Sequence, residues 1–242
     1  MRDRITHPRS SNTMVAGPDG LRVSSRAPGS SLGAKPLGWK ADVEVHMGQN
    51  TVQFSCHHCN HCCTEVVALP TPWDVRRIIK MTEQDPDDFL EFLTPDDIEG
   101  VTKNDPTWLS VKDEKFIMAL RRAAKGCHFM NKKTRLCGIY EARPLLCRLY
   151  PFKLHETVDG KFKGFSLHTN VGCPKHRDGE VSTKPLYDLY VQDDLNQFDY
   201  KELVKVFNEH EYEGKKPRDF VEMFLYGFTN FDRCESLSRK SA

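Results

Sequence analysis

The spacing of apolar positions divides the chain into a first segment without periodicity and a longer segment with mixed patterns. Residues 1–38 are rich in Ser, Gly, Pro and Arg and contain few large apolar residues, so they show neither a helical nor a strand period. We interpret them as a disordered tail, with a transit peptide or an early start codon as alternatives. Folded sequence is predicted to begin near Trp39.

Alternating apolar residues and turn signals predict strands in three places. Residues 41–56 alternate around a turn signal at 48–50, which predicts one or two short strands. Residues 114–122 form an apolar run bounded by charge, which favours a strand, although its period does not exclude a helix. Residues 152–167 alternate on both sides of Asp159-Gly160, which predicts a β-hairpin.

Apolar residues at helical spacing predict helices elsewhere in the chain. Two helices are predicted after the first cysteines, one over 73–81 behind Pro72 and one that starts at Asp85-Pro86 within 85–93. Further helical patterns occupy residues 185–195, 200–211 and 217–228.

These patterns together predict an α+β fold, a mainly helical single domain with short strands and a hairpin. We expect a disordered N-terminal tail (1–38), then a domain that contains the cysteine clusters (39–180), and a C-terminal helical extension (181–242) that packs on that domain. A chain of 242 residues can bury a sizeable core, so its stability does not require a metal.

Charge and hydropathy narrow the classes of partner. The 35 Lys and Arg residues nearly balance 34 Asp and Glu residues, and the signs are interspersed, so neither a nucleic-acid nor a membrane surface is indicated. No run approaches the ~18 apolar residues of a membrane-spanning helix. The cysteines are odd in number and follow no signal-peptide-like stretch, which argues against a secreted disulfide framework. We therefore expect a cytoplasmic protein whose thiols bind metal or do redox work.

Four cysteines occupy the nine-residue stretch SCHHCNHCC at 55–63 and form the pattern C-x-x-C-x-x-C-C. Three more recur ten residues apart, and another follows in a Gly-Cys-Pro sequence. Eight thiols suit two four-thiolate centres, or one polynuclear site plus a structural one. The predicted metal ligands are Cys56, Cys59, Cys62, Cys63, Cys127, Cys137, Cys147 and Cys173. The ninth cysteine, Cys234, lies in a polar stretch and is predicted to be a free thiol.

The spacing favours a 4Fe-4S cluster over zinc and leaves open the presence of both. The opening C-x-x-C-x-x-C matches a bacterial ferredoxin run, and Cys173-Pro174 has the proline that follows the fourth cysteine of such a run. The usual third gap is missing, however, because Cys63 directly follows Cys62. If the block is helical, this adjacent pair would point in two directions, so that three cysteines of the block serve one centre and the fourth serves another.

A buried four-thiolate centre also needs compensating charge. Such a site carries a net charge near −2 around either a doubly charged cubane or Zn²⁺, and its burial requires cations and hydrogen-bond donors. Arg143 and Arg148, on either side of Cys147, are predicted to supply that charge as cofactor-binding residues. With eight thiols present, His57, His58 and His61 are expected beside the site or facing solvent rather than as ligands.

The cysteine motifs resemble those of a known family. The block at 56–63 is followed by C-x-I-Y-x-x-R-P-x-x-C-R-x-Y-P-F at 137–152 and by a later G-C-P at Cys173. This combination, over about residues 50–175, is similar to the CxxCxxCC cysteine-cluster (YkgJ-like) family of zinc- or iron-chelating domains. The resemblance implies a metal-chelating protein, in electron transfer, metal handling or sensing.

A related enzyme supplies the alternative function. The flagellin lysine-N-methylase shares the cysteine pattern and is similar in carrying iron-sulfur, so an iron-sulfur-dependent protein lysine N-methyltransferase is the second hypothesis. This chain is shorter, and binding of S-adenosylmethionine would distinguish the two. No dinucleotide, P-loop, metalloprotease or hydrolase motif is present. The predicted partner is a metal ion or cluster, while the sequence leaves a protein partner, the reaction and the oligomeric state open.

Overall fold

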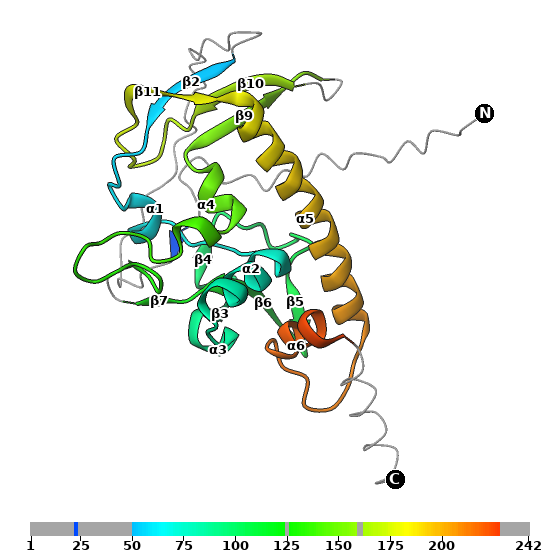
Figure 1. The fold of residues 1–242 in the computed structure, drawn as a ribbon. Helices are drawn as coiled ribbons and strands as arrows, with labels where there is room; N and C mark the ends of the chain where they lie inside the picture. Colours follow the sequence, from blue (N-terminus) through cyan, green and yellow to red (C-terminus); the bar gives the residue numbers. More distant parts are fainter. Residues whose placement is uncertain (1–21, 24–49, 124–125, 159–161, 228–242) are drawn as a thin grey trace, which may run out of the picture.

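The computed structural model of the chain describes residues 22–23, 50–123, 126–158 and 162–227 (Figure 1). Some predictions lie outside these residues: the tail at 1–38 apart from Arg22–Val23, the strand pattern at 41–49, the turn at Asp159-Gly160 and the free thiol at Cys234.

Helices and short antiparallel strands alternate along the described chain. The helices are α1 (His61–Thr64), α2 (Pro72–Thr82), α3 (Pro86–Phe89), α4 (Leu145–Leu149), α5 (Thr183–Glu209) and α6 (Asp219–Tyr226), with a 3-10 turn at Tyr140–Ala142. The strands are β1 (Arg22–Val23), β2 (Thr51–Ser55), β3 (Leu90–Leu93), β4 (Ile98–Glu99), β5 (Leu109–Val111), β6 (Glu114–Leu120), β7 (Arg122–Ala123), β8 (Gly126–Cys127), β9 (Phe152–Glu156), β10 (Phe162–Leu167) and β11 (His176–Ser182). The predicted α+β class is confirmed, although strands contribute more than a mainly helical fold would imply.

A three-stranded antiparallel sheet, in the order β3-β6-β5, lies at the centre of the core. Met118 and Leu120 of β6 face one hydrophobic cluster, and Ile117 and Ala119 face another on the opposite side. Both faces of β6 are therefore buried, which explains why its sequence is a continuous apolar run. The strand predicted at 114–122 is confirmed.

The helix predicted within 85–93 forms only one turn. Asp85 caps α3 by accepting a hydrogen bond from the Asp87 backbone N–H (2.8 Å), and Pro86 opens it as expected. The chain then turns into β3, which pairs antiparallel with β6 from Leu90 opposite Leu120 onward. Pairing with β6 buries Leu90 and Leu93 on opposite faces, so tertiary contacts override the helical start.

Two further strand pairs cover the end of the molecule where α5 begins (Figure 1). β9 and β10 pair antiparallel, as the alternation at 152–167 predicts. β2 buries Val52 and Phe54 and exposes Gln53, in agreement with its alternation. Its partner among the described residues is the distant β11.

The helical patterns at 185–195 and 200–211 belong to one continuous helix, α5. Neither Gly nor Pro interrupts the intervening residues, and Gln192 donates a hydrogen bond to the buried Asn196 (2.8 Å) one turn away. The helix buries Tyr200, Val204 and Phe207 in the main core, together with residues of α2, β6 and α6. None of the helices in the described ranges is long and apolar enough to cross a bilayer.

The side chain of Asp193 on α5 has a carboxylate oxygen in an environment that disfavours its charged form. One oxygen of Asp193 is buried without a hydrogen-bond partner among the described residues. Burial, followed by the charges of Asp74 and Asp194, raises the pKa of Asp193 to about 7. Because this folded-state pKa exceeds the unfolded value, the associated stability is complete below about pH 4 and is lost as the pH rises through about 7.

We expect Asp193→Asn to be more stable than the wild type at pH 8 by roughly 1–3 kcal/mol and about equally stable at pH 4. Urea unfolding of both proteins at each pH measures this difference in unfolding free energy. Other titrating groups affect both proteins equally, so their contributions cancel in the difference. Asp194→Asn is the matched control, since that neighbouring side chain is exposed. A stabilisation independent of pH would contradict this account of Asp193.

Candidate metal centre

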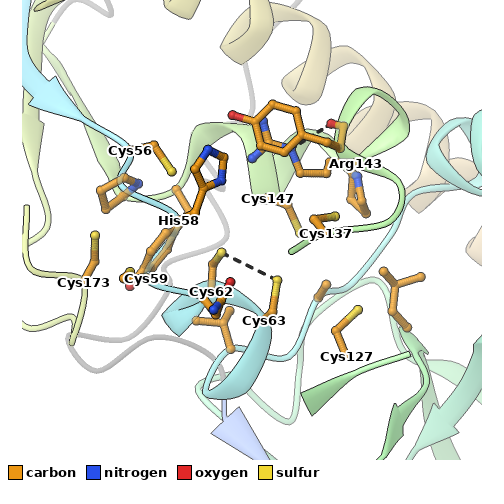
Figure 2. Close-up of a pocket in the computed structure, with 18 of the residues that line it drawn as sticks. Cys56, His58, Cys59, Cys62, Cys63, Cys127, Cys137, Arg143, Cys147 and Cys173 are labelled. Carbon is orange, nitrogen blue, oxygen red and sulfur yellow. Dashed lines mark hydrogen bonds between the residues drawn. The ribbon is translucent and has the colours of Figure 1, made fainter. Parts of the chain in front are cut away.

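All eight cysteines predicted as ligands line one cavity of about 900 Å³, a volume that includes its open mouth (Figure 2). They come from parts of the chain as far apart as Cys56 and Cys173. The structure therefore brings together every thiol of the predicted set. Cys56 and Cys59 are exposed, and the other six are partly buried.

The short helix α1 places two of these thiols side by side. His58 and Asn60 have positive φ values of 53° and 64°, which turn the chain sharply before α1 begins. Asn60 starts the helix, and its carbonyl oxygen accepts a hydrogen bond from the Cys63 N–H (2.8 Å). The Sγ atoms of Cys62 and Cys63 consequently lie 3.9 Å apart. The adjacent pair was expected to serve two centres, but both thiols point to the same part of the cavity (Figure 2).

Gly126 allows α1 to pack closely on β8, which carries Cys127. Its φ of 130° is a conformation that residues with a side chain rarely adopt. A Cβ atom at this position would also lie 2.6 Å from the carbonyl oxygen of Cys63. The glycine therefore holds Cys127 next to the α1 thiols.

We expect Gly126→Ala to destabilise the fold by roughly 2–4 kcal/mol and to lower the metal content, because a backbone clash adds to the strained φ. Gly214→Ala is the control: Gly214 has a φ of 82°, yet a Cβ there would meet nothing within 4 Å. That variant should show only the strain, about 1 kcal/mol. Urea unfolding and metal analysis of both variants test this, and equal effects would refute the packing role of Gly126.

Cys147 is held by an anchor on α2. The carboxylate of Asp74 forms a capping box with Thr71 at the start of α2. It also forms an ion pair with the guanidinium of Arg77 (2.5 Å). The same carboxylate accepts a hydrogen bond (3.1 Å) from the backbone N–H of Leu145, which is the first residue of α4. The position of α4, and of Cys147 on it, thus depends on a buried charge in α2.

The electrostatics connect five of the thiols into one group. A hydrogen bond from Cys63 lowers the pKa of Cys62 to about 7, and another lowers the pKa of Cys137 to about 6. The charge of Arg143 acts in the same direction on both. These bonds raise the pKa of Cys63, and burial raises the pKa values of Cys127 and Cys147. We call this set the inner thiol group: Cys62, Cys63, Cys127, Cys137 and Cys147.

The remaining three thiols interact with one another. Burial raises the pKa of Cys173, and Cys59 and Cys56 raise it further. Ser55 of β2 pairs with His176 of β11, so Cys56 and Cys173 lie just beyond the same end of this strand pair. We call Cys56, Cys59 and Cys173 the outer thiol group.

The two predicted cofactor-binding arginines lie in different places. Arg143 lines the cavity, and its guanidinium stacks on the Tyr140 ring, 3.7 Å from the ring centroid. The guanidinium of Arg148 donates instead to the carbonyl oxygen of Glu141, and Arg148 is not among the residues that line the cavity. Burial, followed by the charges of Arg77 and Arg143, lowers the pKa of Arg148.

Sequence reasoning missed a second arginine that lines the cavity beside Arg143. Arg122 lines the cavity and donates hydrogen bonds to the carbonyl oxygens of Val66 (2.7 Å) and Thr64. It ties the chain after α1 to β7, and its charge lowers the pKa of Cys127 against the larger effect of burial. Arg122 lies opposite Cys127 in the β7–β8 pair, and no sequence motif marks this position.

In the described part of the chain, no three His, Cys, Asp or Glu side chains are already arranged to hold a metal ion. Coordination would therefore require thiols to turn toward a common centre. The donor set fits such a role, because eight soft thiols and the nearby Arg143 and Arg122 provide ligands and compensating charge.

The fold and the cavity define a cysteine-rich α+β domain with eight thiols around one cavity. Residues 55–174 match the model of the CxxCxxCC family, described as "Putative zinc- or iron-chelating domain". An uncharacterized protein of Methanocaldococcus jannaschii is 31% identical over 118 residues, which cover 46% of this chain and 59% of that protein. No solved structure matches the chain significantly.

Proposed function

We propose that this protein holds a metal centre on its cysteines and acts in electron transfer, metal handling or sensing. One observation carries the proposal: eight thiols that are distant in the sequence line a single cavity. The reducing conditions that such thiols need support a cytoplasmic location.

The inner thiol group is the better candidate for a 4Fe-4S cluster. It contains more than the four thiols that a cubane needs, and Arg143 lies beside Cys62 and Cys137. Bound there, a cluster would supply one-electron transfer, whereas zinc would supply a structural cross-link without redox chemistry. The residues of the chain contribute the thiolate ligands, the positive charge of Arg143 and partial exclusion of water.

Anaerobic purification followed by iron, zinc and sulfide analysis, with a visible spectrum, tests this proposal. A brown protein with acid-labile sulfide supports the iron-sulfur centre, and a colourless protein with stoichiometric zinc supports zinc chelation instead. A full-length, folded protein that binds neither metal, even after reconstitution under reducing conditions, would refute the proposal.

No observation in the described part of the chain favours protein lysine methylation over metal binding. The methyltransferase hypothesis stays a prediction. Binding of S-adenosylmethionine to the protein, measured by calorimetry, would support it.

A further inference from the structure

The eight thiols divide unevenly between two parts of the cavity. Figure 2 shows Cys56, Cys59 and Cys173 on one side, while Cys62, Cys63, Cys127, Cys137 and Cys147 gather on the other. The Sγ atoms of Cys62 and Cys63 lie 3.9 Å apart within the second set. The sequence had suggested either two sets of four or one polynuclear site plus a structural one.

Different structural supports carry the two groups. The outer thiol group lies at the end of the β2–β11 pair, whereas the inner thiol group rests on α1, β8 and α4. Cys137 joins the inner group through an isolated antiparallel bridge to Met130. Displacement of one support therefore need not move the other.

The two groups differ in access to solvent, since Cys56 and Cys59 are exposed whereas the inner thiols are all partly buried.

A histidine can complete the outer group. Zinc sites commonly use three thiolates and one imidazole. The ring of His57 pairs with Asp178 (2.9 Å) and stacks on His176, and the Nε2 of His61 accepts a hydrogen bond from the Gly172 N–H (3.1 Å). His58 is the histidine of the block that lines the cavity. In Figure 2 its ring lies beside Cys56, and it also packs against the Tyr140 ring with 5.8 Å between the ring centroids.

We propose that Cys56, Cys59, Cys173 and His58 form a second, solvent-accessible zinc site, separate from the centre held by the inner thiol group. This inference rests on the proposed function, because it concerns the same cavity. The exposed position of two of its thiols implies that zinc leaves this site faster than metal leaves the inner group.

Metal transfer from the full-length protein to a coloured zinc chelator, after loading with Zn²⁺ alone, tests the division. The wild type should release zinc in a fast and a slow phase. Cys59→Ser should lose the fast phase and about one metal equivalent while it keeps the slow phase. Cys137→Ser should keep the fast phase unchanged and speed up the slow phase, because four inner thiols remain to hold zinc less well than the complete group.

The histidine ligand has a matched control in its neighbour. His58→Ala should weaken zinc binding in the fast phase by roughly tenfold or more, and His57→Ala should leave it unchanged. Equal effects of the two substitutions would remove His58 from the site and overturn the proposed ligand set.

The wild type alone provides a second measurement that does not depend on the folding of a variant. After brief chelation has removed the fast-phase zinc, an alkylating reagent followed by mass spectrometry should label Cys56, Cys59 and Cys173 before any inner thiol. Labelling of both groups together, or a single release phase that every thiol substitution reduces equally, would overturn the two-site division but leave the proposed function intact. Absence of any bound metal in the wild type would instead refute the proposed function, and the second site with it.

Discussion

Cys147→Ser is expected to lose most of the metal of the inner thiol group and to lower the stability of the metal-loaded protein by roughly 3 kcal/mol or more. Cys147 lies on α4 among the inner thiols, and burial raises its pKa well above the usual range. A metal must therefore repay the cost of the buried thiolate, so the metal and the fold are coupled at this residue. Metal analysis and urea unfolding, each with and without a chelator, measure both effects.

Cys234→Ser is the control for this experiment, because the same chemical change falls outside the predicted ligand set. It should keep wild-type metal content and stability. After chelation, Cys147→Ser and the wild type should differ much less than before it. Wild-type metal content in Cys147→Ser would exclude this thiol as a ligand.

Asp74→Ala is expected to destabilise the protein by about 3–5 kcal/mol, because it breaks a buried ion pair from one side. Asp74 is only 1% exposed. Its removal would leave the partly buried Arg77 without its carboxylate and the Leu145 N–H without its acceptor. It would also open the capping box with Thr71 at the start of α2.

Asp85→Ala is the matched control, because Asp85 also caps a helix but is mostly exposed. Loss of that cap alone should cost about 1 kcal/mol. Asp74→Ala should also lower metal content, since Leu145 begins the helix that carries Cys147, whereas Asp85→Ala should not. Similar unfolding free energies for the two variants would show that Asp74 acts only as a helix cap.

Helices and strands were predictable wherever the apolar residues of a segment follow a single helical or alternating period. The helix over 73–81 is α2, and its Pro72 and Asp74 act as the start signals that their positions indicate. The strand at 114–122 and the pairing of the two halves of 152–167 also follow from short-range patterns. The helix that starts at Asp85-Pro86 ends after one turn, because the chain continues as β3, which pairs with β6 and buries Leu90 and Leu93 in the two hydrophobic clusters.

The sequence by itself determined the chemistry of this protein. Four cysteines within residues 56–63 and four more in family-like motifs indicate a soft-metal site, because ligand type and short-range spacing are written directly in the chain. Arg143 was predicted near the thiols from its place in the motif before Cys147, and it lines the cavity.

Only the tertiary structure decided how those residues are arranged. It pairs β2 with β11 and thereby places Cys173 near Cys56, and it brings Cys137 toward α1 while Arg148 turns to the Glu141 carbonyl. Spacing along the chain defines neighbours within a turn or two, whereas contacts across more than a hundred residues depend on which faces the core buries. The five-and-three division of the thiols is therefore a property of the folded chain.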